Sequence, residues 1–485
     1  MKKTLVYYSV FYIFLLFLQR GAGILTKMVL ANSLTPFDYG VITLVALSLP
    51  SMFQFITNAF FYQMLSHSQE GRKYFGFTVW CSIVISILIS VLLALFNKEF
   101  FDYLNLPSEQ RFLFYVTIVV SLFFVSIIID FQGLFAGLKQ YSLPAIIMTL
   151  PSIVRLFAVV LIVVLGINSF ELVILIFALS NIIPLIYIFC SKEHRSFFSE
   201  LKTICFPPRH MIAFGVTLLL IGSLSTTGQL IIRLVISHML GVIWQGYYDV
   251  SMTLAALSVF ALGTMNYISI PEATNSDKTV IYQQGGLVDV SRALFAVMIL
   301  VLLLLYFYAE TFVVILFSDE YLAGSRYAFI LSIGYVFLFV QSYLAYLNLS
   351  IATTQRDFFK LSAIPFIALP LFYFITEFLI TYFQNLGYDN GFIGAYVSYT
   401  LLLGIVMVLT ILMSRDLSPL YMLTHKIERL IFSSFIVFIG ILLIKPSPII
   451  GIVIILCLFG GLIVATGYVN KTMIMDFINR KQAED

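Results

Sequence analysis

Long apolar runs recur along the whole sequence and constrain its fold more than any other feature. Each is long enough to cross a hydrocarbon layer of roughly 30 Å, and short polar connectors separate them. Fourteen spans are predicted, at residues 5–34, 41–64, 74–96, 112–137, 143–166, 168–190, 210–241, 246–271, 291–317, 326–352, 360–383, 390–413, 429–445 and 448–468. None has the alternation of a barrel strand. With 61% hydrophobic and 11% charged residues, the chain is expected to be an all-α polytopic membrane protein.

The basic residues predict the orientation of these spans. Nineteen of the 27 lysines and arginines fall on one side of the membrane, and four lie within spans. The other side has Lys98, Arg111, Arg326 and Lys445. The positive-inside rule therefore places both termini in the cytoplasm. Because the helical spans exclude an outer-membrane barrel, the protein is expected in the cell inner (plasma) membrane. The net charge of +3 reflects this topology and does not indicate binding to nucleic acid.

Two polar connectors on the cytoplasmic side divide the chain. The first is "SKEHRSFFSELKTICFPPRH" (191–210), and the second is "SRDLSPLYMLTHKIER" (414–429). Each closes a set of six predicted spans, and two further spans follow the second connector. The predicted domains are a six-helix bundle at 1–209, a second six-helix bundle at 210–428, and a C-terminal helix pair with a cytoplasmic tail at 429–485.

The two six-span sets carry related sequences. At an offset of 206, "KMVLANSLTPFDYG" (27–40) aligns without a gap on "RLVISHMLGVIWQG" (233–246). Lys27 then falls on Arg233, and Gly40 falls on Gly246. Because six spans return the chain to its starting side, the sets are predicted to be parallel repeats, related by a pseudo-twofold axis along the membrane normal, with a cleft between them.

Four basic residues lie inside predicted spans, where exposure of a charge to lipid costs at least about 2.5 kcal/mol. Arg20 and Lys27 are seven residues apart, so they share one helix face and can hold one elongated anion. Arg20 and Arg155 lie nearer mid-span, which favours a cavity filled by water or ligand. Lys27 and Arg233 lie far along their spans, so snorkelling to the outer headgroups is an equal alternative.

The seventh span presents a comparable polar face. Its polar residues recur at i, i+3, i+7 and i+11, as Thr226, Gln229, Arg233 and Ser237. Two polar stripes, one from each set, could thus face each other across the cleft. The predicted substrate-binding residues are Arg20, Lys27, Arg155, Arg233, Gln229 and Thr226.

Acidic residues inside the spans are fewer. Asp130 in the fourth span and Glu377 in the eleventh either neutralise a buried arginine or couple transport to H⁺ or Na⁺. Asp249 falls in the first turn of a predicted span, where the helix dipole favours an acid, so a capping role is expected for it. The ion-coupling candidates are therefore Asp130 and Glu377.

The sequence does not carry the marks of an enzyme. Its five histidines form no evident acid/base cluster, its four cysteines lack metal-ligand spacing, and it has no Walker motif. We predict no catalytic residue, no metal site and no cofactor. A membrane-embedded sugar-transferring enzyme is the least favoured function, because the outer connectors are too short for the large ordered loop that such an enzyme would need.

Several stretches together resemble one transporter group. They are "LANSLTPFDYGVITL", its echo "HMLGVIWQGYYDV", "SIPEATNSDK" (269–278) and "LFSDEYLAGSRYAFILS" (316–332). With the two six-span sets, they resemble the O-antigen (Wzx-type) flippases of the multidrug/oligosaccharidyl-lipid/polysaccharide exporter superfamily, over nearly the whole chain.

This resemblance implies a flippase for an undecaprenyl-diphosphate-linked oligosaccharide, working by alternating access. The lipid II flippases of the superfamily use first-span arginines in a cationic cavity, which Arg20 and Lys27 resemble. Membrane lipid, a coupling ion (H⁺ or Na⁺) and a glycan polymerase are the further partners implied. A cation-coupled small-molecule antiporter of the same fold is the alternative, although the spans offer more bases than acids.

Overall fold

The computed structural model describes residues 2–58, 73–138, 142–167, 169–191, 204–259, 285–351, 355–414 and 426–468, with a few single positions between them. Every regular element in these ranges is a helix, and eleven helices are long and apolar enough to cross a membrane. The prediction of a polytopic helical membrane protein is thus confirmed. The count of fourteen spans stays a prediction, because parts of the second and eighth, at 59–64 and 260–271, lie outside the described residues.

Local sequence signals explain where several helices begin. The hydroxyl of Thr35 accepts a hydrogen bond from the backbone N–H of Asp38, and Pro36 occupies the first position of α2 (Pro36–Ile42). Ser169 caps α9 (Phe170–Ser180) in the same way, through the N–H of Leu172. These caps satisfy amide groups that the first turn of a helix leaves without partners.

The chain separates into two compact units. The first contains residues 1–250, 316–321 and 353–399, and the second contains the rest. The boundaries after residues 250 and 399 fall inside α12 (Val242–Ala255) and α19 (Ile393–Met413). The predicted domain boundaries at 209 and 428 follow the sequence instead, and they stay predictions.

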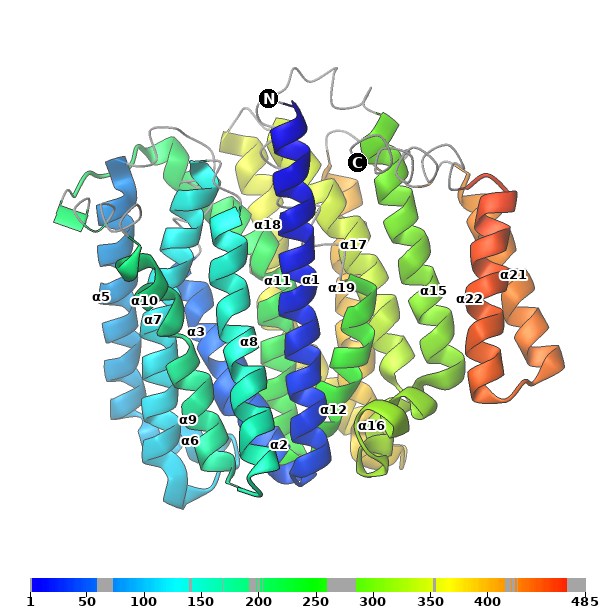
Figure 1. The fold of residues 1–485 in the computed structure, drawn as a ribbon, viewed down its shortest axis with the longest axis horizontal. Helices are drawn as coiled ribbons and strands as arrows, with labels where there is room; N and C mark the ends of the chain where they lie inside the picture. The colour runs from blue at the N-terminus through cyan, green and yellow to red at the C-terminus, as the bar shows by residue number, and fades with distance from the viewer. Residues whose placement is uncertain are drawn as a thin grey trace. The chain divides into compact units, whose positions relative to one another are not determined.

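The first unit holds the N-terminal helices together with α11, the start of α12 and α18 (Figure 1). Besides α2, α9 and α12, its helices are α1 (Lys2–Ser33), η1 (Thr43–Ser48), α3 (Leu49–Asn58), α5 (Phe75–Leu95), α6 (Asn97–Tyr103), α7 (Arg111–Gly137), α8 (Ser142–Val164), α10 (Ile183–Cys190), α11 (Arg209–Met239) and α18 (Gln355–Asn385). Helix α1 packs along α8, α5 along α7, and α11 along α18. An aromatic core that includes Phe75, Phe131 and Phe135 fills the space between α5 and α7.

Two glycines allow α2 and α12 to cross at close range. A Cβ atom on Gly40 would overlap the backbone carbonyl oxygen of Val242, and one on Gly246 would overlap that of Pro36. Val242 lies four residues before Gly246, and Pro36 lies four residues before Gly40, so the contact is reciprocal. The glycines that the sequence aligns at an offset of 206 therefore meet directly, and only residues without a side chain fit there.

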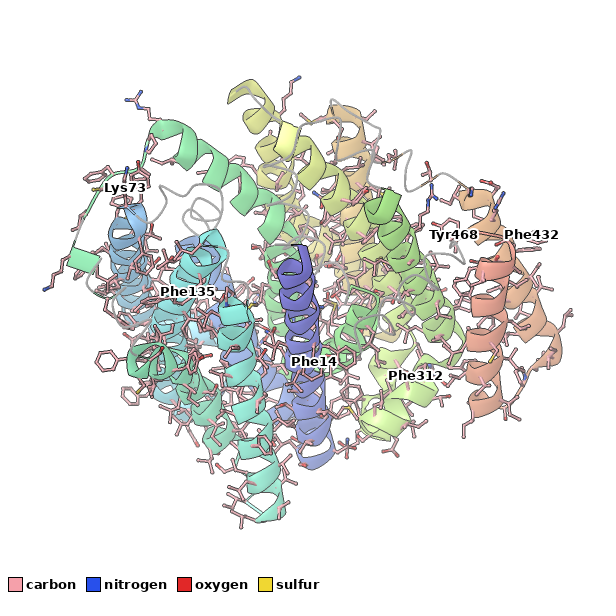
Figure 2. The ribbon with its side chains drawn as sticks, turned by 45° about the horizontal axis from the view of Figure 1, so that its top comes forward. Phe14, Lys73, Phe135, Phe312, Phe432 and Tyr468 are labelled. Atoms are coloured by element: carbon pink, nitrogen blue, oxygen red, sulfur yellow. The ribbon has the colours of Figure 1, made fainter. Side chains whose placement is uncertain are left out.

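The second unit contains the remaining long helices. They are α15 (Gly285–Leu316), α17 (Ala328–Ile351), most of α19, α21 (Ile427–Ile444) and α22 (Pro448–Ala465). Helices α21 and α22 pack side by side as the predicted C-terminal pair (Figure 1). The Tyr308 hydroxyl of α15 fills the space beside Gly451 of α22. Exposed apolar side chains such as Phe432 on α21, and Phe14 on α1 of the first unit, suit contact with lipid (Figure 2).

The glycine crossing predicts a position-specific loss of stability. Gly40→Ala should destabilise the purified protein by about 1–3 kcal/mol, because the new methyl group forces α2 away from α12. Gly23→Ala on α1 is the matched control, since a Cβ there meets no atom within 4 Å. Thermal unfolding of both variants tests this, and equal unfolding midpoints would refute the tight crossing.

Candidate functional site

The site is built around the carboxylate of Asp249, which lies between two cations. Lys27 Nζ lies 2.8 Å from Oδ2 and 3.0 Å from Oδ1, and Arg233 Nη2 lies 2.6 Å from Oδ1. The Asp249 side chain is fully buried, while those of Lys27 and Arg233 keep 23% and 10% of their exposure. Two cations thus share one counter-ion, and the cluster carries one net positive charge.

Neutral groups complete the arrangement. The Tyr39 hydroxyl donates to Asp249 Oδ2 over 2.7 Å, and Arg233 Nη1 donates to Ser48 Oγ over 2.8 Å. The Tyr248 ring lies 5.9 Å from the guanidinium carbon of Arg233. Ser48 ends η1, a π-helical turn, and such turns occur frequently at functional sites. Arg233 is therefore held by groups from η1 and α12, and the Asp249 carboxylate also accepts a hydroxyl from α2.

The cluster joins the first spans of the two predicted six-span sets. Lys27 lies near the end of α1 and Arg233 near the end of α11, and the sequence aligned these two residues. The expected capping role of Asp249 is wrong, because its side chain neutralises cations from other helices. The 206-residue offset matches Asp249 with Thr43, so the acid breaks the repeat. This difference between the two repeats is the sequence feature that could have identified Asp249 as a functional residue.

Several buried polar atoms around the cluster have no hydrogen-bond partner among the described residues. Both side-chain atoms of Gln245 are in this state, and so are the hydroxyls of Tyr248 and Tyr321. Gln245 lies one turn before Asp249 on the same face of α12. Burial raises the pKa of Tyr321, whose ring packs edge-on against that of Tyr39 at 5.6 Å, so its hydroxyl stays neutral. A site with these free donors and acceptors suits a polar ligand or bound water.

Three other predicted substrate-binding residues lie on the same two long helices. Arg20 is half-buried on α1, two turns before Lys27. On α11, Gln229 Nε2 donates to the Tyr399 hydroxyl over 2.8 Å, whereas Thr226 is exposed. The predicted stripes are therefore continuous with the cluster along both helices, and the roles of these residues stay predictions.

Arg155 makes a different set of contacts. Its Nε donates to Ser180 Oγ over 2.7 Å and its Nη2 donates to Asn181 Oδ1 over 2.5 Å, while the guanidinium carbon lies 5.0 Å from the centre of the Phe177 ring. These partners lie where α9 ends and the chain turns into α10. The contacts favour a structural role at this helix break, and the predicted contact with substrate is not tested by them.

The two predicted ion-coupling acids differ in their surroundings. Asp130 on α7 is fully buried near the Ser82 hydroxyl of α5, and among the described residues neither of its oxygens has a partner with hydrogen-bond geometry. Glu377 is exposed on α18. Among the described residues Asp130 forms no ion pair with an arginine, and its role stays a prediction. Neither acid contacts the Asp249 cluster through a described ion pair.

The fold and the site together define a polytopic helical membrane protein with a buried, positively charged cluster. Residues 29–326 match the family of polysaccharide biosynthesis proteins, and this chain belongs to that family. No curated protein matches the sequence.

Solved transporter structures share the fold at low sequence identity. The lipid II flippase MurJ, in an inward closed conformation, superposes with a TM-score of 0.65 at 12% identity over 93% of this chain and 98% of MurJ. A MOP superfamily transporter from Pyrococcus furiosus gives 0.57 at 13% identity, over 87% and 96%. The Vibrio cholerae MATE transporter VcmN gives 0.54 at 12% identity, over 84% and 95%. These superpositions show that the chain shares the fold of these transporters.

The shared counter-ion predicts coupled effects on stability. Asp249→Asn should destabilise the protein by about 3–5 kcal/mol, because it leaves two partly buried cations without an anion. Adding Lys27→Met should recover part of this loss, since one uncompensated charge is removed. A double-mutant cycle in thermal unfolding measures the coupling. Strictly additive effects would mean that Lys27 and Asp249 do not interact.

The Arg155 contacts predict that charge alone cannot replace this residue. Arg155→Lys should lower stability by about 1–2 kcal/mol, because an ammonium group cannot reach Ser180 and Asn181 at the same time. Transport measured on the folded fraction should be retained if the residue only supports the helix break. A stable Arg155→Lys variant that fails in transport would instead favour direct contact with substrate.

Proposed function

We propose that the protein is a flippase for an undecaprenyl-diphosphate-linked oligosaccharide, an O-antigen or related glycan repeat unit. It moves this lipid from the cytoplasmic to the outer leaflet of the inner membrane by alternating access, with both termini in the cytoplasm. Family membership supports a role in polysaccharide biosynthesis. The single observation that carries the proposal is the Asp249 cluster, which holds one cation from each predicted set around one acid.

The charge of the cluster suits exchange of one anion for another. In the present structure the Asp249 carboxylate forms ion pairs with both Lys27 and Arg233. A diphosphate offers more negative charge and more acceptor oxygens than one carboxylate, so it can compete for both cations. The Asp249 carboxylate competes with the diphosphate for the two cations and pairs with them again when the lipid leaves. This competition limits the affinity for the lipid. Moderate affinity is what a carrier needs, since the substrate must also be released.

The protein needs to shield only the polar head of the lipid, because the prenyl chain is soluble in the membrane. Arg20 on α1, and Gln229 and Thr226 on α11, extend the polar surface available to the head. Moving two negative charges outward, with the cytoplasm negative, gains about 4.6 kcal/mol per 100 mV of membrane potential. Net transport can therefore proceed without ATP.

Ion coupling is a second part of the proposal. The buried carboxyl of Asp130, without a hydrogen-bond partner among the described residues, supports binding of H⁺ or Na⁺ at this helix pair. Glu377 is the second candidate. The same feature favours the alternative function, a cation-coupled small-molecule antiporter. The positive charge of the Asp249 cluster favours an anionic substrate instead. The proposed partner that receives the transported lipid is a glycan polymerase.

The flippase proposal is tested by removing both cations. Lys27→Gln with Arg233→Gln should lower surface glycan at least tenfold and cause undecaprenyl-linked repeats to accumulate inside, because each lost charge-assisted bond is worth about 1.5–3 kcal/mol. Mass spectrometry of lipid extracts measures this in cells lacking the native gene. Arg326→Gln is the matched control, since its pair with Glu310 is exposed and contributes little.

The outcome separates the two functions. Normal glycan output from the double variant, at normal membrane levels, would remove the cluster from transport and end the proposal. Unchanged lipid-linked intermediates combined with altered efflux of cationic dyes would favour the antiporter.

A further inference from the structure

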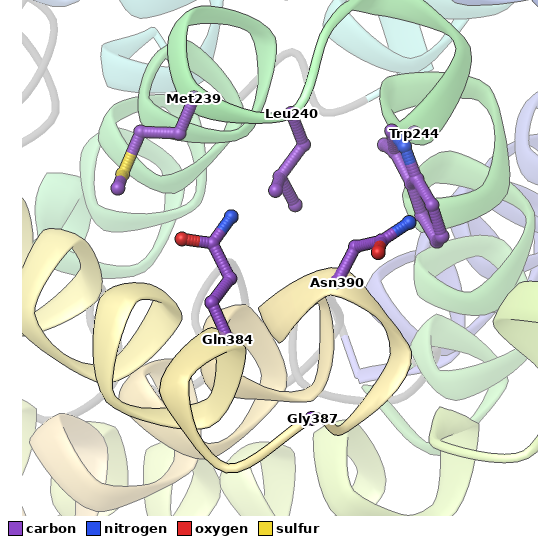
Figure 3. A pocket seen from close by; sticks show the side chains of 6 residues that line it. All are labelled: Met239, Leu240, Trp244, Gln384, Gly387 and Asn390. Atoms are coloured by element: carbon purple, nitrogen blue, oxygen red, sulfur yellow. The ribbon is translucent and has the colours of Figure 1, made fainter.

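A cavity of about 350 Å³ lies in the first unit, apart from the charged cluster. The end of α11 and the start of α12 form one wall, and the end of α18 with the turn that follows forms the other (Figure 3). The lining residues are Met239, Leu240, Trp244, Gln384, Gly387 and Asn390. The volume falls within the range of about 300–1,000 Å³ that is usual for small-molecule sites.

The lining chemistry is polar but uncharged. The carboxamides of Gln384 and Asn390 project into the cavity, and the Trp244 ring stands at its side (Figure 3). Each carboxamide both donates and accepts hydrogen bonds, which matches the hydroxyl groups of a sugar. The indole adds a flat apolar surface for the C–H face of a pyranose ring, with an N–H donor at its edge. None of the six lining side chains carries a charge, so the cavity has no cation to pair with a phosphate.

The surroundings hold these groups in place. The Trp244 ring packs against Phe392 at a centroid distance of 4.7 Å and against Tyr247 at 5.6 Å, and Phe392 is fully buried. Asn390 has a left-handed backbone conformation, with φ of 50°, in η7 (Asp389–Gly391), the short 3-10 helix that follows α18. A ring fixed by two aromatic neighbours loses little entropy when a ligand stacks on it.

The cavity lies farther along the two helices that carry Arg233 and Asp249. On α11, Met239 follows Arg233 by six residues, a rise of about 9 Å. On α12, Trp244 precedes Asp249 by five residues, a rise of about 7.5 Å. Both steps lead toward the predicted outer side. The cavity therefore lies on the outer side of the cluster, between one and two helical turns away along each helix.

We propose that this cavity is a binding subsite for an uncharged sugar ring, with Trp244 as the stacking surface and Gln384 and Asn390 as the hydrogen-bonding groups. The inference rests on the proposed function, since the sugar belongs to the glycan of the transported lipid. The subsite selects on the sugar, whereas the cluster binds the diphosphate that all such lipids share.

Tryptophan fluorescence tests the subsite directly, because the chain has only two tryptophans. The other is Trp80, exposed on α5, and Trp80→Phe leaves Trp244 as the sole reporter. The full-length purified variant is titrated with glucose, galactose, N-acetylglucosamine and their disaccharides. Saturable quenching or shift of the emission by an uncharged sugar is the expected result, at the millimolar affinity of a single subsite. Inorganic pyrophosphate should leave the emission unchanged.

Variants of the carboxamides identify the binding groups. Gln384→Leu and Asn390→Gly should each weaken the fluorescence response about fivefold to tenfold, as expected for loss of hydrogen bonds to sugar hydroxyls. Both residues are exposed, and glycine tolerates the left-handed conformation at 390, so folding should be retained. Asn385→Leu is the matched control, because this exposed residue at the end of α18 does not line the cavity, and it should leave the response unchanged.

The results distinguish the subsite from the flippase proposal. If no sugar in the panel changes the emission, or if the carboxamide variants respond like the parent, the subsite is wrong. Loss of glycan export on removal of Lys27 and Arg233 would then still support the flippase. If sugars bind as expected but export does not need the two cations, the subsite stands and the flippase mechanism fails.

Discussion

A carboxylate cut off from water stays charged only when cations and hydrogen-bond donors surround it, and much of the first unit meets this requirement for Asp249. Lys27, Arg233 and Tyr39 reach it from three different helices. Because the two cations outnumber the acid, the arrangement is neutralised only in part. The ion pairs that hold α1, α11 and α12 together therefore leave one excess positive charge, which can attract a further anion.

The backbone crossing of α2 and α12 makes this geometry possible. Tyr39 immediately precedes Gly40, and Asp249 follows Gly246 by three residues. With side chains at the two glycines, the helices would lie farther apart, and the hydroxyl could not reach the carboxylate at 2.7 Å. Packing and electrostatics are thus coupled, since the absence of two side chains sets the distance between two polar ones.

The polar groups of the first unit form separate sites that differ in charge and hydrogen-bonding character. The Asp249 cluster is charged, the cavity at Trp244 is lined by carboxamides, and Arg155 is occupied by the break between α9 and α10. Asp130 lies in the aromatic region between α5 and α7 with no cation paired to it among the described residues. This separation suits a substrate with an anionic part and an uncharged part, because each part meets groups of matching character.

The sequence by itself determined the class of fold, since runs of about 20 apolar residues can satisfy their backbone in lipid only as helices. It also identified the unusual cations and aligned Lys27 with Arg233 and Gly40 with Gly246, because these depend on residue type and spacing along the chain. Only the tertiary structure decided that both cations share Asp249, that Arg155 bonds to a helix end, and that Trp244 and Gln384 line one cavity. These pairings join residues up to 222 positions apart, and helical periodicity specifies which face a residue occupies without specifying which helix will pack against that face.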